Sequence, residues 1–191
     1  LVYAKNKGNA KTELLARTEE MNSKYSNPDN DPEGNWTSGD PCARTKSEKD
    51  RYAIQSPFTG DLHYPGSGSW RNTKKNMKTY LEAWGSKYFE KDLGDGRPKA
   101  LVIKGAKIPV VPVEQNLDNN PTVRMEEKDE QIIKSEKKAL KIQKSGVMPI
   151  LHFLKEGYGR PRCKRYLKYV KQGKVPLTFW ADEDYDEEFV L

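Results

Sequence analysis

The sequence predicts an α+β domain with a small mixed sheet, several helices and a long charged insertion that is expected to be helical. Helical spacing of apolar residues in some segments, and short β-rich runs bounded by turn residues in others, lead to this prediction. The length of 191 residues suits a single domain. Because hydrophobic residues make up 35% and charged residues 32% of the chain, we expect a thin core with long charged excursions.

The first half of the chain predicts helices and one hairpin. We expect a strand end at residues 1–4, a helix at 11–24, a hairpin within 51–64 and a helix that follows Thr73. The evidence for the second helix is the i, i+3, i+4, i+7 spacing of Met77, Tyr80, Leu81 and Trp84. Thr73 can cap its start, and Gly85 can end it.

The second half predicts short strands followed by a long helix. Residues 88–89 and 100–103 have the composition of strands, and 108–113 is expected to be an edge strand because it contains two prolines. Residues 122–145 are the most charged stretch and carry only a narrow apolar stripe. A long helix mostly in solvent is therefore expected, with partner binding as the alternative.

Residues 161–172 are predicted to form a basic helix. The predicted buried face consists of Cys163, Tyr166, Leu167 and Val170 at helical spacing. Lys164, Arg165, Lys168 and Lys171 would point elsewhere, and Arg160 and Arg162 would lie at the N-terminal end. Such a helix can bind phosphates through point charges and through its positive dipole end. The alternative is a helix whose basic face is only solvated.

Residues 25–40 are too polar for a helix or a strand, and they are dense in turn residues. Pro28 and Pro32 restrict the backbone, while Gly34 and Gly39 permit turns. We expect an ordered loop, which either carries function on a rigid scaffold or only covers a small core with Trp36.

The charge of the chain is unevenly spread. The formal net charge is +6, and residues 181–191 contain six acidic residues and no Lys or Arg. Removing these six negative charges leaves residues 1–180 at +12. A basic body beside an acidic segment is the expected footprint of a protein that binds a polyanion, and ordinary solubility is the alternative.

Cysteine usage and hydropathy limit the classes of protein that fit. Cys42 and Cys163 are the only cysteines, and neither lies in a Cys-x-x-Cys pair, so no zinc site is expected. A disulfide between these two cysteines is the alternative, although a reduced cytosolic setting fits better. Neither a membrane-length apolar run nor a signal peptide is visible, so no membrane partner is expected. The chain begins at Leu1 without Met, so we expect an excised domain.

Four motifs in order resemble adenine-specific DNA methyltransferases of type III restriction–modification systems, specifically their Mod subunit. The motifs are Arg17–Met21, the loop at 25–40, Tyr52–Gly60 with Pro65 and Trp70–Arg71, and residues 159–176 with Trp180. The resemblance covers roughly residues 1–90 and 150–180. It departs at Glu33, where Arg is common, and at Asn35, where Pro is common. Residues 97–149 have no counterpart in the family's pattern.

The resemblance implies the target recognition domain of such an enzyme, which lies between the catalytic loop and the cofactor loop. Residues 66–69 look like the loop that cradles S-adenosylmethionine, but no buried apolar strand precedes them. Residues 30–33 lack the second proline and the aromatic residue that hold a flipped adenine. We therefore expect no catalytic residue and no cofactor in this segment, while the parent enzyme would use S-adenosylmethionine to methylate adenine N6.

The implied function is sequence-specific recognition of double-stranded DNA in the bacterial cytoplasm. The predicted DNA contacts are Arg160, Arg162, Lys164, Arg165 and Lys168, followed by Arg71, Lys74 and Lys75. The loop residues Asn27, Asp29, Asn30, Asp31 and Trp36 are expected to brace the domain against the catalytic domain of the same polypeptide, near the flipped base. Aromatics beside charges, namely Trp36, Tyr64, Trp70 and Tyr158, could stack on bases or belong to the core.

The expected organisation is one domain over residues 1–191. Residues 1–10 would be the edge of the catalytic domain, 97–149 an insertion and 181–191 an acidic tail. The alternative function is a protein-interaction module that docks a methyltransferase or restriction subunit through residues 122–145 and the acidic tail. A second methyltransferase subunit and a restriction subunit are the further partners that the resemblance implies. A complete small enzyme is the third hypothesis, and the sequence shows no nucleophile–base pair for it.

Overall fold

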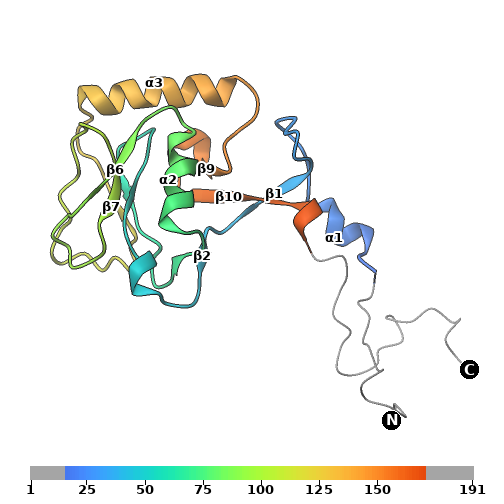
Figure 1. The fold of residues 1–191 in the computed structure, drawn as a ribbon, viewed down its shortest axis with the longest axis horizontal. Coiled ribbons are helices and arrows are strands. Elements are labelled where there is room, and N and C mark those ends of the chain that lie inside the picture. The colour runs from blue at the N-terminus through green and yellow to red at the C-terminus, as the bar shows by residue number, and fades with distance from the viewer. Residues whose placement is uncertain (1–15, 171–191) are drawn as a thin grey trace, which may run out of the picture.

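In the computed structural model, which describes residues 16–170, short strands alternate with helices and form mixed sheets (Figure 1). The predicted α+β class is therefore confirmed. The strand end expected at residues 1–4 and the acidic segment at 181–191 lie outside the described residues.

The largest sheet has five strands in the order β6-β7-β3-β4-β8. They are β3 (Ile54–Gln55), β4 (Leu62–His63), β6 (Tyr88–Lys91), β7 (Ala100–Ile103) and β8 (Thr122–Val123). All neighbours are antiparallel except β3 and β7, which are parallel. Strands β7 and β8 come from segment 97–149, so this segment is part of the sheet as well as the site of the long helix.

The β3–β4 hairpin at the centre of the sheet confirms the turn predicted around residues 57–60. Gly60 has φ of +79°, a conformation that favours glycine, and its amide donates to the Ser56 carbonyl at 3.0 Å. The Ser56 hydroxyl also accepts from the Phe58 amide at 3.2 Å. Residues 51–66 are buried throughout, so the hairpin is the interior of the molecule and not an exposed turn.

A second sheet has the order β1-β10-β9, and it corrects the main helix prediction. Its strands are β1 (Trp36–Gly39), β9 (Leu151–Phe153) and β10 (Pro161–Tyr166). The helix predicted at 161–172 is wrong, because β10 is the middle strand and pairs antiparallel with both neighbours. Within the described part of that range, 161–170, only η3 (Leu167–Tyr169), a single 3-10 turn, is helical. Backbone N–H and C=O groups of this segment form hydrogen bonds with β1 and β9. This long-range pairing outweighed the helical spacing of the apolar residues.

The remaining strands β2 (Cys42–Ala43) and β5 (Ser69–Trp70) form a short antiparallel pair. A Cβ atom on Gly68 would lie 2.0 Å from the carbonyl oxygen of Ala43. Glycine is therefore required here for the close approach of two backbones. This packing accounts for a glycine in residues 66–69 without reference to a cofactor.

The helix over residues 74–82 is confirmed. Helix α2 (Lys74–Glu82) has Thr73 as its N-cap, whose side chain accepts from the Asn76 amide, and Gly85 follows with φ of +87°. Of the helix predicted at 11–24, only α1 (Glu19–Ser23) is seen, and residues 11–15 lie outside the described part. Two further 3-10 turns are η1 (Glu48–Asp50) and η2 (Lys155–Gly157).

The long charged helix is confirmed with later bounds than predicted. Helix α3 (Glu130–Lys144) is capped by Asp129 and lies across the top of the body in Figure 1. It buries Ile132, Ser135 and Ala139 and leaves most other positions exposed or half-buried. The predicted start at residue 122 is wrong because 122–123 is strand β8. The edge strand predicted at 108–113 is also wrong, since that segment is irregular.

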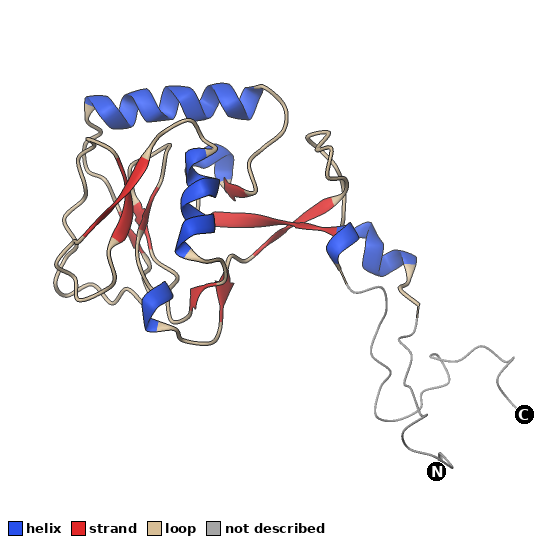
Figure 2. Cartoon of the chain, in the orientation of Figure 1, coloured by secondary structure: helices blue, strands red, loops and turns tan. Residues whose placement is uncertain are grey.

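The main core lies between the five-stranded sheet and the helices. Phe58 packs edge-on against Trp84 with ring centroids 4.9 Å apart, and the Trp84 indole donates to the Leu151 carbonyl at 2.7 Å. Trp36, Tyr64 and Trp70 are buried, which corrects the idea that they stack on bases. Figure 2 shows β1 and β10 as a long ribbon that runs from this body to the end where α1 lies.

Candidate nucleic-acid interface

The predicted DNA contact Lys164 lies in the interior, in a cluster with two aspartates. Its side chain is 0% exposed, and its Nζ lies 2.6 Å from the Asp29 carboxylate and also pairs with the Asp31 carboxylate. The Trp36 indole donates to Asp29 at 2.8 Å, and the Tyr166 hydroxyl donates to Asp31 at 2.7 Å. Strand β10 therefore turns Lys164 toward the loop and away from solvent.

The charges of this cluster change the pKa values of its carboxyl groups. Burial raises the pKa of Asp29, but hydrogen bonds from Lys164, Trp36 and the Met148 amide outweigh it and hold the pKa below its usual 3.8. Burial likewise raises the pKa of Asp31, and hydrogen bonds from Lys164, the Glu33 amide and Tyr166 lower it further than burial raises it. Both aspartates are therefore ionised at neutral pH, as a buried lysine requires.

The loop that carries these aspartates is ordered by its own side chains. The Asn27 side chain accepts from the Asp31 amide at 2.7 Å and donates to the Asp31 carbonyl at 2.9 Å. Asn30 has φ of +50°, which Asn tolerates better than most residues, and its side chain is exposed. The loop is thus rigid, and Asn30 lies on its outer side.

Lys168 contacts Glu33 and does not stand free at the surface. The two charges are 2.6 Å apart, and the Tyr169 hydroxyl also donates to Glu33 at 3.0 Å. A hydrogen bond from Lys168, followed by one from Tyr169, lowers the pKa of Glu33. Glu33 stands where arginine is common in the resembling family, so this ion pair accounts locally for the departure.

Three of the predicted arginines converge on one short segment. Arg162 donates to the Ser38 carbonyl at 3.1 Å, Arg165 to the Asp40 carbonyl at 3.0 Å and Arg71 to the Cys42 carbonyl at 2.8 Å. The exposed Arg160 lines a small hollow together with Arg162 and Cys42. Carbonyls fix the positions of the guanidinium groups of Arg71, Arg162 and Arg165 without neutralising them. Among residues 16–170, no carboxylate lies within 4.0 Å of any of these four guanidinium groups.

The start of helix α2 continues this concentration of positive charge. Arg71, Thr73 and Lys74 line one hollow with Lys49 and Asp50, which places the helix start beside Arg71. Lys74 donates to the Lys99 carbonyl at 2.8 Å and pairs with Glu90 at 3.4 Å, whereas Lys75 is exposed. The first turn of α2 contains no acidic residue, although acids are favoured at helix N-termini.

We call the resulting area the basic surface; it consists of Arg71, Lys74, Lys75, Arg160, Arg162 and Arg165. Of the eight predicted DNA contacts, the structure places Arg71, Arg162 and Arg165 around residues 38–42, and it separates Lys164 and Lys168 from them. Sequence reasoning singled out these residues because their charge is visible locally. It placed them on a helix because it could not see the partners of strand β10.

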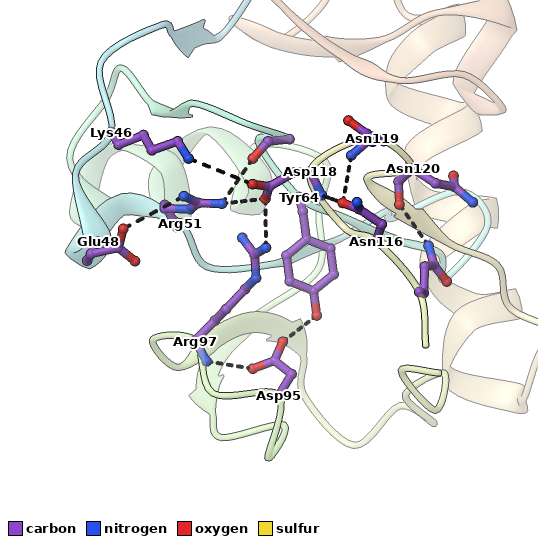
Figure 3. Close-up of polar contacts among 12 residues, drawn as sticks. Lys46, Glu48, Arg51, Tyr64, Asp95, Arg97, Asn116, Asp118, Asn119 and Asn120 are labelled. Carbon is purple, nitrogen blue, oxygen red and sulfur yellow. Dashed lines mark hydrogen bonds and ion pairs between the residues drawn. The ribbon is translucent and has the colours of Figure 1, made fainter. Parts of the chain in front are cut away.

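A second ionic cluster, which the sequence did not predict, joins the segment before β3 to the β6–β7 and β7–β8 connections (Figure 3). Asp118 accepts from Arg51 and, at 3.0 Å, from Arg97, and Lys46 lies 3.9 Å from it. A hydrogen bond from Arg97, and then the charges of nearby cations, lower the pKa of Asp118. The cluster fastens four loops together, and no local pattern could indicate it because its members are far apart in sequence.

Ser38 and His152 form a further contact between strands that the sequence did not indicate. The Ser38 hydroxyl lies 3.0 Å from His152 Nε2, and the imidazole packs against Trp36 with ring centroids 5.4 Å apart. Burial lowers the pKa of His152, so the ring is neutral at pH 7. Its Nδ1 has no hydrogen-bond partner among the described residues, whereas a catalytic triad needs an acid there. We assign this pair to side-chain packing across β10, the strand that lies between β1 and β9.

Residues 16–170 contain no cluster of three His, Cys, Asp or Glu side chains that could hold a metal ion. Cys42 and Cys163 are free thiols. None of the helices described there combines the length and apolarity needed to span a membrane.

Comparisons with protein-family models, with curated protein sequences and with solved structures found no match to this chain.

Proposed function

We propose that this chain grips double-stranded DNA through the basic surface, as the target recognition domain of a type III-like adenine-N6 DNA methyltransferase. One observation carries the proposal: several arginines are positioned by backbone carbonyls and have no carboxylate partner. The motifs that resemble the Mod subunit favour DNA as the polyanion. The positions of the arginine side chains indicate where the DNA would bind.

The positioned arginines suit both parts of DNA recognition. A guanidinium group has five N–H donors, so an arginine that gives one to a carbonyl keeps the others for phosphate oxygens or for guanine O6 and N7. Phosphate contacts provide affinity and base contacts provide specificity. Since Arg71, Arg160 and Arg165 are exposed, we assign the first contacts with the duplex to them.

The rigid loop beside the basic surface would serve a different partner. Asn30, Pro32 and Glu33 are exposed on its outer side, while Asp29 and Asp31 tie it to β10. We propose that this outer side meets the catalytic domain of the same polypeptide, where S-adenosylmethionine would bind. The proposal includes the bacterial cytoplasm as the location, and a second methyltransferase subunit and a restriction subunit as partners of the parent enzyme.

A protein-interaction role for segment 97–149 is the second candidate, and exposed apolar residues favour it. Val110 is 86% exposed and Val113 is 100% exposed, and both lie in the stretch 108–113, which forms no strand. An apolar contact there would suit a protein subunit better than DNA. The variant V110D/V113D should then weaken binding of the catalytic domain or restriction subunit while duplex affinity stays the same.

The main test is selection of this chain against a randomised duplex library at two salt concentrations. We expect an enriched sequence that contains adenine, and an affinity that falls linearly with the logarithm of salt concentration. The variant R71A/R165A should lose about tenfold or more in affinity, at roughly 1–3 kcal/mol for each lost contact that reads a base. The control K91A/K144A removes the same charge from exposed positions outside the basic surface and should change affinity little.

Two results would contradict the proposal. Absence of duplex binding at low salt would exclude a DNA-gripping role for the chain. Methyl transfer by the purified chain in the presence of S-adenosylmethionine would exclude the assignment to a recognition domain without a catalytic centre. Salt-sensitive binding without an enriched sequence would mean that the chain grips phosphates and needs its catalytic domain to read bases.

A further inference from the structure

A groove between α3 and the adjoining ends of β6 and β7 concentrates positive charge and shares no residue with the basic surface. It encloses about 330 Å³. Its lining includes Lys87 before β6, Lys104 after β7, and Lys134 and Lys138 on α3. No acidic residue lines it. We call it the lysine groove.

Three of the four lysines in the groove have no compensating charge. Lys134 pairs with Glu130, one turn earlier on α3, at 2.6 Å. Within residues 16–170, no carboxylate lies within 4.0 Å of the Nζ atoms of Lys87, Lys104 or Lys138. The groove therefore has a positive potential that residues 16–170 leave unbalanced.

The arrangement of these lysines costs stability. Lys87 and Lys104 are cross-strand neighbours, since the Lys104 amide donates to the Lys87 carbonyl at 2.9 Å and extends the β6–β7 ladder. Lys134 and Lys138 are four residues apart on one helix. Like charges are unfavourable in both arrangements. Pairs of like charges on both walls of one groove are expected where a ligand of opposite charge compensates their repulsion.

The walls of the groove are held in place by tight packing. Gly85 has φ of +87°, and a Cβ atom there would lie 3.2 Å from Ile142 Cδ1 and 3.3 Å from Lys138 Cβ. Beside it, the buried hydroxyls of Ser86 and Ser135 are hydrogen-bonded at 2.8 Å and link β6 to α3. The groove is thus preformed, so a ligand would not have to order its walls.

We propose that the lysine groove binds phosphate groups. Lysine acts as a point charge for phosphate, whereas the centres of protein interfaces are depleted in lysine and need exposed apolar side chains. The apolar residue that lines this groove, Ile103, is only 4% exposed. The phosphates come either from the backbone of a bound duplex or from a free polyphosphate. The first source rests on the proposed function, and the second does not.

The test replaces groove lysines by neutral glutamine and compares two phosphate probes. The variant K87Q/K104Q/K138Q is matched by K137Q/K141Q/K144Q, which removes the same charge from exposed positions on α3 outside the groove. Duplex affinity is measured from 50 to 200 mM salt, and inorganic tripolyphosphate binding is measured by calorimetry. Because the groove variant removes repulsion between like charges, its melting temperature should be unchanged or higher.

If the phosphates belong to the duplex, the salt slope should become shallower by about 2–3 in the groove variant alone, at roughly 0.9 per lost phosphate contact. If they belong to a free polyphosphate, the groove variant alone should lose tripolyphosphate binding while duplex affinity is unchanged. Equal changes in both variants, or no change with either probe, would overturn the groove proposal. Failure of the wild-type chain to bind duplex would overturn the proposed function only, since the tripolyphosphate titration still decides the groove.

Discussion

At the residue scale, Lys155 and Glu156 stand out because both are non-glycine residues in the left-handed region. Their φ angles are +50° and +55°, and the turn is closed by a hydrogen bond from the Gly157 amide to the Leu154 carbonyl at 3.2 Å. A turn whose two central residues are both left-handed favours Asn-Gly there. Each left-handed side chain costs roughly 1–2 kcal/mol. The chain therefore has strain at the tip of the hairpin that leads to Arg160.

Replacement of this pair by the favoured turn residues should stabilise the protein. We expect K155N/E156G to raise the free energy of unfolding by about 1 kcal/mol, since asparagine and glycine adopt the left-handed region at low cost. Urea denaturation of the variant and the wild type measures the difference. The control K155A/E156A keeps side chains in the same region and should bring no gain. A loss of stability in K155N/E156G would contradict the turn geometry.

At the element scale, β10 shows why sequence spacing misled the prediction for residues 161–172. Cys163, Tyr166 and the following apolar residues fit a helical face, and charged residues elsewhere fit its solvent side. In the strand, Lys164 is buried because Asp29 and Asp31, more than 130 residues away, neutralise it. From the sequence pattern alone, a lysine is expected to face solvent. The ion pairs of Lys164 with Asp29 and Asp31 stabilise it in the interior instead.

The pairing of β1 with β10 also controls the position of Arg165. The Arg165 side chain crosses directly over Gly39, where an added Cβ would lie 2.2 Å from its Nε. The backbone of Gly39 does not have a positive φ, so its conformation does not require glycine. Glycine is needed there because a Cβ atom would overlap the Arg165 side chain. The element thus sets the direction in which one cation of the basic surface points.

The variant Gly39→Ala should move Arg165 without removing its charge. We expect duplex affinity to fall about as far as in Arg165→Ala, while the free energy of unfolding changes by less than about 1 kcal/mol, since a flexible side chain can shift. In the Arg165→Ala background, Gly39→Ala should have no further effect on affinity. A double-mutant cycle measured by fluorescence anisotropy checks this coupling. Additive losses would show that Gly39 acts through another residue.

At the scale of the whole molecule, the Asp29–Lys164–Asp31 cluster connects the loop at 25–35 to the sheet that carries Arg162 and Arg165. The cluster also affects the acid stability of the fold. Both aspartates have pKa values lower than in the unfolded chain, where they are near 3.8. Their contribution to stability is therefore complete above that value and is lost as the pH falls through the lower folded pKa values.

Replacement of Lys164 should show this dependence of stability on pH. Lys164→Met leaves two buried carboxylates without a cation, so we expect a loss of about 3–5 kcal/mol at pH 7. The difference from wild type should shrink below about pH 4, since protonation removes the uncompensated charges. Urea unfolding at pH 7, 5 and 3 measures it. The control Lys168→Met breaks an exposed pair with Glu33 and should cost much less. Equal losses in both variants would contradict the buried role of Lys164.

Local patterns by themselves determined much of this protein. The capped helix α2, the β3–β4 hairpin, strand β7 and the charged helix α3 follow from residues close together in sequence, because caps, turns and periodicity act over one or two turns of chain. Composition also indicated a basic body. Tertiary structure decided that residues 161–166 form a strand, that Lys164 is buried, and which cations remain uncompensated. These outcomes depend on partners far along the chain, and no local pattern contains that information.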